Sequence, residues 1–338
     1  YNFVGNREMN IHKIIYFLVI VSALIGQDQE QTVGLFLNTA AAAPGYTLFA
    51  PMSYNVTYLI DNNGELVQSW PSEYRPGLSV YILENGDLLR TRRLQGQFFQ
   101  TGGRGGGVEI IDWDGNLIWE FDYFSNQFWQ HHDIESLPNG NILLIAWEHK
   151  TDAEAIANGR NPILLGGSSQ PFGFWPDHII EVDPDSNSVV WEWHVWDHII
   201  QDDDSSKANY GVVSNHPELV NINYPIGPNT DGGDWLHINA VDYNAELDQI
   251  MLSVHHFGEI WIIDHSTTTA EAASHSGGNS GKGGDLLYRW GNPQAYIGGN
   301  SNERMFFGQH DARWIENGSL IMVFNNGSGR PGGSYTSV

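Results

Sequence analysis

The sequence is built on a repeated pattern of two short apolar segments joined by a tight turn. An Asn-Gly or related pair between such segments is typical of a two-stranded antiparallel hairpin. Hairpins of this type are predicted at four places, the third of which lacks the turn glycine: residues 80–91, 134–147, 241–254 and 314–324. Because strands and turns fill most of the chain, and no amphipathic helix of convincing length competes with them, the fold class must be all-β.

A second pattern alternates with the first. Here a strand ends at an aspartate, the chain turns, and it re-enters through a strand that carries a tryptophan, at residues 58–70, 108–122, 179–193 and 260–291. The two patterns together give units of four antiparallel strands at a spacing of roughly 40–50 residues, which is typical of propeller blades. We therefore predict a β-propeller domain over residues 46–338.

The first and last units look shorter than the others. The first unit, near residues 46–70, lacks an innermost strand, and the last unit, from His310, stops after two strands. Because a propeller must close on itself, the sequence predicts a ring that is incomplete at its C-terminal end, with about four to five blades present.

Composition excludes several classes of partner. Lys and Arg total 15 against 40 Asp and Glu, a formal charge of −25, which argues against a nucleic acid or an anionic membrane surface. The chain has no cysteine, so disulfides, thiol catalysis and cysteine-ligated metals are excluded.

The N-terminal region reads as a targeting segment. From Met9, a short region with Lys13 precedes an apolar run from Ile14 to Gly26, which predicts a signal peptide over residues 9–27. A membrane anchor fits less well, since a spanning helix needs about 20 apolar residues. We expect a secreted, periplasmic or cell-surface protein without a stable membrane span. Residues 1–8 are interpreted as an upstream artefact, and residues 28–45 as a lead-in to the propeller.

Three long segments interrupt the rhythm of the strands. Residues 150–176 and 198–234 are rich in Gly, Pro, Asn and Asp, and residues 274–285 are expected to form a flexible turn. Loops of this length on a regular scaffold usually line or cover a site. The acidic stretch 200–211 is a candidate calcium site, although runs of carboxylates are more often simply solvated.

Histidine recurs at one position of the hairpin pattern. Counting back seven residues from the turn asparagine gives His132, His237 and His310 in three units, and Leu78 in the fourth. The first strand of a propeller blade lines the central channel, so these histidines are predicted to face one another. A buried histidine that merely bonds a nearby turn is the commoner case. Leu78 shows that the scaffold tolerates an apolar residue there, which favours a functional cluster.

Other polar side chains surround the three histidines in the sequence. The candidates for substrate binding are Asn239, His255, His256, His131, Arg289 and Arg330. Alternation along a strand places His237 and Asn239 on one face and places His131 and His132 on opposite faces. The sequence leaves open which of those two faces the channel.

Four blocks of sequence, in order, carry a resemblance to a known family. They are "QHHDIESLPNGNILL", "DWLHINAVDYNAELDQIMLSVHHFGEIWIID", "LLYRWGNP" and "FGQHDARWIENGSLIMVFNNGSGRP". With them, most of residues 45–332 resembles the bacterial arylsulfotransferases. The resemblance implies a secreted six-bladed propeller that moves a sulfuryl group from an aryl sulfate donor to a phenolic acceptor. It also implies that no cofactor or nucleotide sulfate donor is needed.

The resemblance also implies roles for single residues. His310 matches the family's nucleophilic histidine, His237 and His132 match its supporting channel histidines, and Asn239 matches its substrate-contacting asparagine. The family typically has arginine eighteen positions after the His237 equivalent, where this chain has His255. Arginine is always charged and binds in a fork, whereas the charge of histidine depends on pH. Sulfate binding is therefore expected to involve His255 itself, Arg289 or Arg330.

The chemistry fits these residue types. A neutral imidazole can attack sulfur and expel a phenolate, with a second histidine as proton donor and acceptor. Two alternatives remain open: three channel histidines also suit a zinc- or copper-dependent hydrolase or lyase, and the scaffold can serve as a non-catalytic binding module.

Overall fold

The structure of the protein is a computed structural model that describes residues 34–165, 173–224, 233–316 and 318–338. The predicted upstream segment 1–8, the signal peptide 9–27, the start of the lead-in and the turn residue Asn317 lie outside this range. Among the described residues, no helix is long and apolar enough to cross a membrane.

The chain forms two compact units. The described part of the smaller unit comprises residues 34–47 and 59–67, and the larger unit comprises residues 48–58 and 68–338. The sequence-based boundary at residue 46 differs from this division, since it assigns 46–47 and 59–67 to the same domain as the rest. All residues of the candidate site belong to the larger unit.

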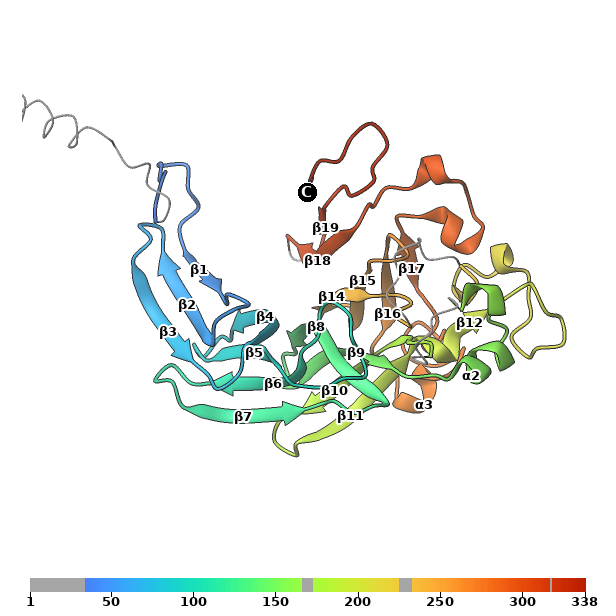
Figure 1. The fold of residues 1–338 in the computed structure, drawn as a ribbon, viewed down its shortest axis with the longest axis horizontal. Helices are drawn as coiled ribbons and strands as arrows, with labels where there is room; N and C mark the ends of the chain where they lie inside the picture. Colours follow the sequence, from blue (N-terminus) through green and yellow to red (C-terminus); the bar gives the residue numbers. More distant parts are fainter. Residues whose placement is uncertain (1–33, 166–172, 225–232, 317) are drawn as a thin grey trace, which may run out of the picture. The chain divides into compact units, whose positions relative to one another are not determined.

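Nearly all regular structure is antiparallel sheet (Figure 1). The strands, in sheets that follow the chain order, are β1 (Tyr46–Phe49), β2 (Val56–Asp61) and β3 (Leu66–Pro71); β4 (Pro76–Ile82), β5 (Leu88–Arg93), β6 (Gly106–Ile111) and β7 (Leu117–Asp122); β8 (Phe128–Ser136), β9 (Ile142–Glu148), β10 (Asp177–Asp183) and β11 (Ser188–His194); β14 (Ile238–Asn244), β15 (Gln249–Val254), β16 (Glu259–Asp264) and β17 (Tyr288–Trp290); and β18 (Gln309–Ile315) and β19 (Leu320–Asn325).

The remaining elements are short and lie between these sheets. They are the parallel pair β12 (Ile199–Ile200) and β13 (Val220–Asn221), the helices α2 (Asp152–Ala157) and α3 (Thr269–Ala272), and the 3-10 turns η1 (Pro162–Leu164), η2 (Val195–His198), η3 (Val213–Asn215), η4 (Pro293–Tyr296) and η5 (Ser301–Glu303). The sequence prediction that no long helix competes with the strands is confirmed for the described residues.

The sheets are arranged as the blades of a β-propeller. Three of them have four strands in simple up-and-down order, and the predicted hairpins β4–β5, β8–β9, β14–β15 and β18–β19 are all formed. The first strand of each of these sheets contacts the first strand of the next, in the order β4, β8, β14 and β18 (Figure 1). The predicted fold class is confirmed, and residues on the first strands are brought together.

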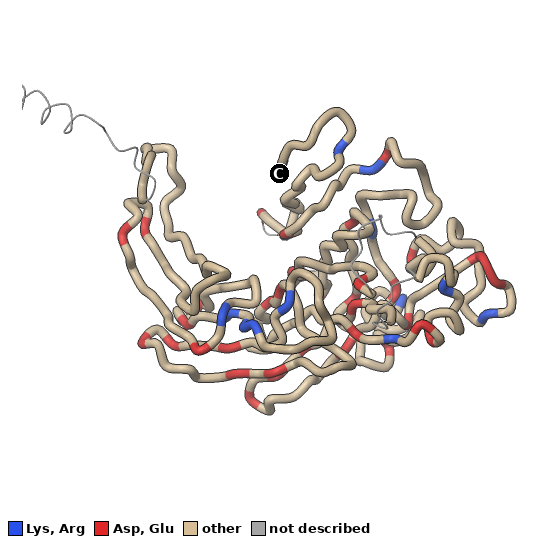
Figure 2. Tube along the Cα trace, in the orientation of Figure 1, with Lys and Arg blue, Asp and Glu red and all other residues tan. Residues whose placement is uncertain are grey.

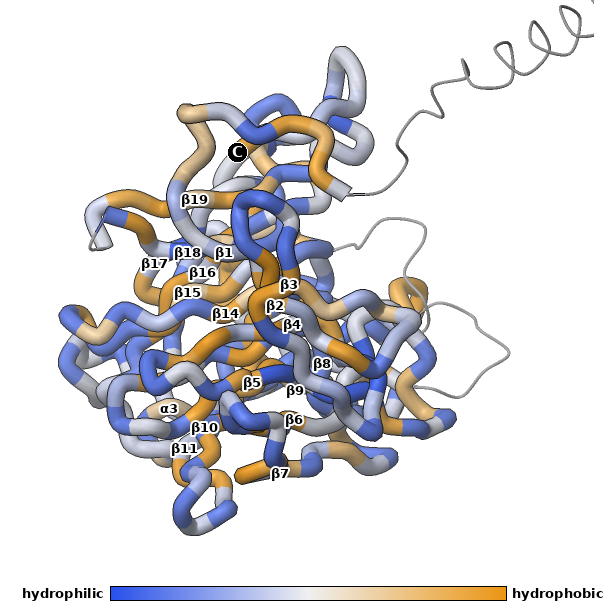
Figure 3. The backbone as a smooth tube through the Cα atoms, turned by 90° about the vertical axis from the view of Figure 1, so that its left-hand side faces the viewer, coloured by the Kyte–Doolittle hydropathy of each residue, from blue (hydrophilic) through white to orange (hydrophobic). Residues whose placement is uncertain are grey.

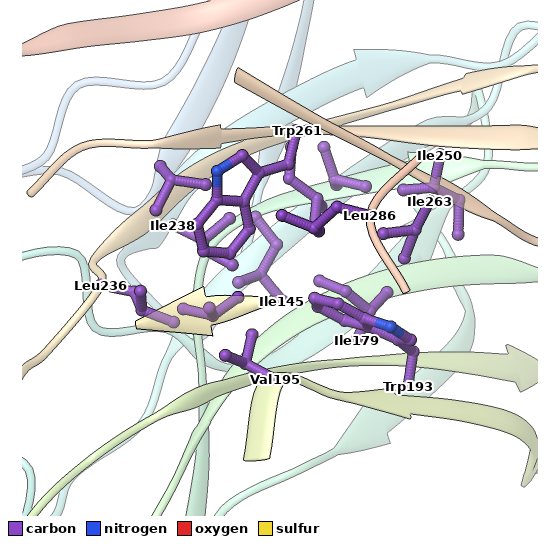
Figure 4. Close-up of a cluster of buried hydrophobic side chains, with 14 of the residues drawn as sticks. Ile145, Ile179, Trp193, Val195, Leu236, Ile238, Ile250, Trp261, Ile263 and Leu286 are labelled. Atoms are coloured by element: carbon purple, nitrogen blue, oxygen red, sulfur yellow. The ribbon is translucent and has the colours of Figure 1, made fainter. Parts of the chain in front are cut away.

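The apolar cores lie between consecutive sheets. Alternate residues of one strand serve different cores: Leu144 of β9 packs toward β5 and β6, whereas its neighbour Ile145 packs in a cluster with Trp193, Ile238 and other residues (Figure 4). Hydrophobic stretches accordingly fall on the strands and hydrophilic ones on the loops (Figure 3). A strand covered on both faces has to be apolar at nearly every position, which explains the continuous apolar run of β9.

Charged residues are mostly acidic and recur along the strands, with Lys and Arg few (Figure 2). A buried ion pair joins two neighbouring strands: Arg90 Nε of β5 lies 2.8 Å from Glu109 Oε1 of β6, and the two side chains are 0% and 3% exposed. Arg90 also donates to Thr57 Oγ1 and to the main-chain oxygen of Tyr74. A buried pair of this kind is costly to break, because removing one partner leaves the other as an uncompensated charge.

The substitution Arg90→Met is therefore expected to lower the free energy of unfolding by about 3–5 kcal/mol, since it leaves the buried Glu109 carboxylate with only Arg92 Nη1 at 4.0 Å as a cationic partner. Arg93→Met is the matched control: Arg93 ends the same strand, is exposed, and its loss should change stability by less than about 0.5 kcal/mol. Urea unfolding of both variants measures the difference. Equal stabilities would contradict the assignment.

Candidate active site

The first strands of four sheets carry an irregularity at or next to the position that the hairpin count singled out. The pairing register shifts within β4, β8, β14 and β18. Leu78, His132 and His237 have positive φ angles of 124°, 50° and 54° at or beside these bulges. In the last hairpin the residue with positive φ is Asp311 (48°), one position after His310. A left-handed conformation costs a non-glycine residue about 1–2 kcal/mol, so the strands are bent at some cost where the histidines lie.

The bulges bring the predicted histidines together. The ring centroids of His132 and His237 are 4.4 Å apart, those of His237 and His255 5.3 Å, and those of His255 and His310 5.2 Å. His256 stacks on His237 at 4.9 Å. A cavity of about 520 Å³ opens beside this cluster, with His132, Asn239 and His310 among its lining residues, together with Leu78.

The ring of His310 is fixed in one orientation. Its Nδ1 lies 2.8 Å from Asn326 Oδ1 and 3.2 Å from the main-chain oxygen of Gly308, and both of these atoms accept hydrogen bonds. Nδ1 must therefore carry the proton in the neutral ring. Nε2 is left with a free lone pair, which is the arrangement that a nucleophilic histidine requires. Asp311 does not orient this ring, because its Oδ1 accepts from Arg313.

A buried chain of hydrogen bonds ends at His132. Asp177 Oδ1 lies 2.7 Å from His131 Nε2, and His131 Nδ1 lies 2.8 Å from His132 Nδ1. His131 is fully buried and stacks on Trp147, whereas His132 lines the cavity. Burial, and next the neighbouring His132, lower the pKa of His131 well below its usual range, while burial raises that of Asp177 well above its own.

The hydrogen bonds that link Asp177, His131 and His132 couple the protonation states of the three side chains. If Asp177 is ionised, His131 donates from Nε2 and accepts at Nδ1, so His132 presents a bare Nε2. If Asp177 is protonated, every bond reverses and His132 presents an Nε2–H. His132 can therefore act as either an acceptor or a donor toward the cavity. His131 acts through His132 and does not face the cavity itself.

His237 is held by a carboxylate. Its Nδ1 lies 2.5 Å from Asp234 Oδ2, and Asp234 also accepts from the indole of Trp147 at 3.0 Å and from Thr101 at 3.3 Å. Burial would raise the pKa of Asp234, but the charge and the hydrogen bond of His237 outweigh it and hold the pKa below its usual value. An ionised Asp234 can only accept, so it fixes the proton of His237 on Nδ1 and directs Nε2 away from the carboxylate.

The two adjacent histidines 255 and 256 are mainly neutral. Burial, followed by the neighbouring His237, lowers the pKa of His255 to about 3, and burial also lowers that of His256. His255 Nδ1 is buried without a hydrogen-bond partner among the described residues. Where a cation was expected from the family pattern, the chain thus provides an uncharged ring with an unused nitrogen.

Asn239 lies beside these rings with part of its amide unused. Its Nδ2 donates to the main-chain oxygen of Gln309 at 2.8 Å, and its Oδ1 has no partner within the described part of the chain. The second N–H of Nδ2 and the free Oδ1 are available to a ligand in the cavity that Asn239 lines.

The structure does not bring the two candidate arginines to the cluster. Arg289, on the outer strand β17, pairs with Glu259 at 2.5 Å and donates to main-chain oxygens at residues 217 and 219. Arg330 donates to Ser337 and lies over the ring of Tyr335, beside a separate cavity of about 970 Å³. Neither guanidinium contacts a channel histidine, so their assignment to substrate binding has no support in this geometry.

Several residues of the site were not found from the sequence. Asp177, Asp234 and Asn326 orient the rings of His131, His237 and His310, and none belongs to the hairpin pattern. The only sequence signal was the spacing of Asp234, three residues before His237.

Arg313 of β18 was also missed. It lines the same cavity as His310, and its guanidinium pairs with Asp133 at 3.2 Å, Glu135 at 2.8 Å and Asp242 at 3.5 Å, while also bonding the hydroxyl of Tyr81. Because its charge is balanced by these carboxylates, it is not a free cation for an anionic ligand.

Two metal sites were considered from the sequence: a zinc or copper site at the channel histidines and a calcium site in residues 200–211. In the described chain, one group of His and Asp side chains has its ligand atoms within 4.8 Å of one another, and it consists of His198, His275 and Asp285, outside the cavity. The channel histidines do not form such a group. In the acidic stretch 200–211, Asp203 accepts from the amides of Asn161 and Asn223, and the calcium site there stays a prediction.

The family model of the arylsulfotransferases (ASST) matches residues 27–336, nearly the whole of the described chain. The chain belongs to the arylsulfotransferase family. The resemblance inferred from the four sequence blocks is thereby confirmed. No curated protein matches the sequence.

Several solved structures resemble this arylsulfotransferase family member at low identity. They are a protein of unknown function from Bacteroides caccae (12% identity, TM-score 0.44, 84% of this chain and 66% of that one), the hydrazine synthase of Kuenenia stuttgartiensis (12%, 0.44, 83% and 67%) and the Dos1 propeller (12%, 0.40, 83% and 52%). The chain thus spans about two thirds or less of the length of these structures.

In this arylsulfotransferase homologue, Gly103 makes room for the ring of His132. Its φ is +85°, and a Cβ there would lie 1.9 Å from His132 Cε1. Gly103→Ala is expected to displace the ring and lower the free energy of unfolding by about 1–3 kcal/mol. Urea unfolding and the imidazole NMR signals of His132 report both effects.

The neighbouring Gly102→Ala is the control, because a Cβ at that position meets nothing within 4 Å. It should leave both the stability and the histidine signals unchanged. If Gly103→Ala behaved in the same way, the close approach to His132 would be refuted.

Proposed function

We propose that this protein transfers a sulfuryl group from an aryl sulfate to a phenolic acceptor through a sulfated His310. The observation that carries the proposal is the orientation of His310: Nδ1 is bound to Asn326 and Gly308, which leaves Nε2 as the nucleophilic atom beside the cavity. Membership of the arylsulfotransferase family supports the class of reaction.

In the first half-reaction, Nε2 of His310 attacks the sulfur. A nitrogen–sulfur bond forms, the bond between sulfur and the aryl oxygen breaks, and the phenolate leaves with the electron pair. Phenols are tolerable leaving groups because their pKa is near ~10. His237, whose Nδ1 is bound to the Asp234 carboxylate, is the proposed proton donor to this oxygen.

The second half-reaction is the reverse with a new phenol. The incoming hydroxyl gives its proton to His237, its oxygen attacks the sulfur, and the nitrogen–sulfur bond breaks to restore His310. No nucleotide, metal or other cofactor takes part in this scheme, since the sulfuryl group passes directly between the ring and the two phenols.

Charge on the sulfuryl oxygens is stabilised by neutral donors in this proposal. They are the second N–H of Asn239 and the N–H of His255. When Asp177 is protonated, the Nε2–H of His132 is a third donor. Donors fixed in advance at a desolvated site stabilise a transition state without reorganisation. Arg313 contributes little, because its charge is already balanced by acidic partners.

His310→Ala is expected to reduce the release of phenol from an aryl sulfate by at least about 10³-fold, because it removes the atom that forms the covalent bond. Rapid quenching of the wild type, followed by mass spectrometry, should find a sulfuryl adduct on the peptide that holds His310. His216→Ala, which removes a histidine with a half-exposed side chain, is the control and should retain full activity.

Three results of this assay count against the mechanism. Undiminished turnover in His310→Ala would exclude His310 as nucleophile, and an adduct on another residue would relocate the chemistry. A wild type that binds aryl sulfates but releases no phenol would favour the alternative of a binding module.

His255→Arg is expected to strengthen the binding of aryl sulfates. Since the pKa of His255 is about 3, its ring is uncharged near pH 7, and arginine would add a permanent charge. A charge-assisted hydrogen bond contributes about 1.5–3 kcal/mol, so KM should fall about tenfold or more. Steady-state kinetics with the neutral control His255→Gln, whose KM should stay near that of the wild type, tests this. A KM in His255→Arg equal to that of His255→Gln would contradict it.

A further inference from the structure

A second cluster of titratable side chains lies between the third and fourth sheets. His198 ends the turn η2, which follows β11, while His275 and Asp285 lie near the two ends of the glycine-rich loop that precedes β17. Both imidazoles approach the same carboxylate oxygen: His198 Nδ1 is 2.8 Å and His275 Nδ1 is 2.7 Å from Asp285 Oδ1. The loop, which the sequence predicted to be a flexible turn, thus folds back on a buried histidine.

The hydrogen bonds of His198 fix its tautomer. Its Nε2 lies 2.8 Å from the main-chain oxygen of Ala272, which can only accept, so Nε2 carries a proton. In the neutral ring, Nδ1 then presents a lone pair to the carboxylate of Asp285, which also has only lone pairs to offer. The side chains of His198 and Asp285 are 0% and 9% exposed, so both groups are withdrawn from solvent. A cation between Nδ1 and the carboxylate removes this conflict.

The surroundings of His198 resemble the support that metal-ligating histidines receive. Such a histidine commonly donates its second ring N–H to a main-chain oxygen, as Nε2 does here to Ala272. The ring also stacks on Trp193, whose indole donates to Gly284 O at 2.7 Å. A Cβ on Gly284 would lie 2.0 Å from Ala272 O and 2.6 Å from His198 Nε2, so only glycine allows this close packing.

We propose that His198 Nδ1, His275 Nδ1 and Asp285 form a site for a divalent transition-metal ion of the zinc class. Two imidazoles and one carboxylate suit zinc, and their ligand atoms already lie within 4.8 Å of one another. Around tetrahedral zinc, neighbouring ligand atoms are about 3.3 Å apart. Asp285 Oδ1, which lies 2.8 Å from His198 Nδ1 and 2.7 Å from His275 Nδ1, therefore needs to separate from each nitrogen by only about half an ångström.

The fourth position of this ion faces solvent. The side chain of His275 is 63% exposed, and it lines a cavity of about 510 Å³ together with Trp196, Tyr210 and His216. Water is the proposed fourth ligand. The ion ties the loop of residues 274–285 to the end of η2, and so joins two consecutive sheets independently of the chemistry at His310.

The test is metal binding by the full chain, freed of any affinity tag and stripped with a chelator. Calorimetric titration with zinc should give one equivalent bound, and cobalt should give the visible absorption of a tetrahedral site. His275→Ala removes an exposed ligand without disturbing the interior, and should weaken zinc binding by on the order of 100-fold or more. Zinc should raise the melting temperature of the wild type but not that of this variant.

Two controls separate this site from other histidines. His216→Ala removes another histidine at the same cavity, and His237→Ala removes one from the channel; both variants should still bind one equivalent. The proposal is overturned if the wild type binds no zinc, if His275→Ala binds it as the wild type does, or if binding is lost in His237→Ala instead.

Discussion

The first strands of four successive sheets meet at one guanidinium. Arg313 of β18 reaches Asp133 and Glu135 of β8, Asp242 of β14 and the hydroxyl of Tyr81 in β4. Without this cation the carboxylates would repel one another in a poorly solvated region. Even with it the balance is incomplete: burial raises the pKa of Glu135 to about 7 and also raises that of Asp133. The inner wall of the fold is therefore held by shared charge as well as by apolar packing.

This constraint reaches the chemistry, because Arg313 lines the same cavity as His310. A cation that is already neutralised cannot also hold a sulfate group, and His255 is uncharged near pH 7. In the proposed mechanism, an anionic substrate is bound by fixed neutral N–H donors, which lose less on desolvation than charged groups do. The proposed mechanism thus depends on how the rings are oriented. Asn326 binds Nδ1 of His310 and Asp234 binds Nδ1 of His237, whereas Asp177 acts on His132 through His131.

The fold was predictable from the sequence because each hairpin has a local signal, a turn between two short apolar segments. Turn pairs and apolar segments fixed the strands, and the equal spacing fixed the blades, without any long-range information. The site was predictable only in part. Counting from the turns found His132, His237 and His310 because the same hairpin recurs. It did not foresee the bulges: the positive φ falls on His132 and His237 themselves but, in β18, on Asp311, one residue after His310. Arg289 was a candidate because it lies in "LLYRWGNP", one of the blocks that carry the family resemblance, yet it sits on the fourth strand of its sheet, three strands away from β14.

The partners of the histidines lay beyond sequence reasoning for a different reason. Asp177 begins β10 and is 46 residues away from His131 in the sequence, and Asn326 follows β19. Only the tertiary structure brings Asp177 to His131 and Asn326 to His310. The same holds for the strain at His132, whose φ of 50° is maintained by neighbours: its main-chain N–H bonds Gly103 O at 2.7 Å, and Gly103 gives the ring its space. Strained residues persist only where the surroundings determine them. The loop that contains Gly103 is therefore as much a part of the candidate active site as the strand that carries His132.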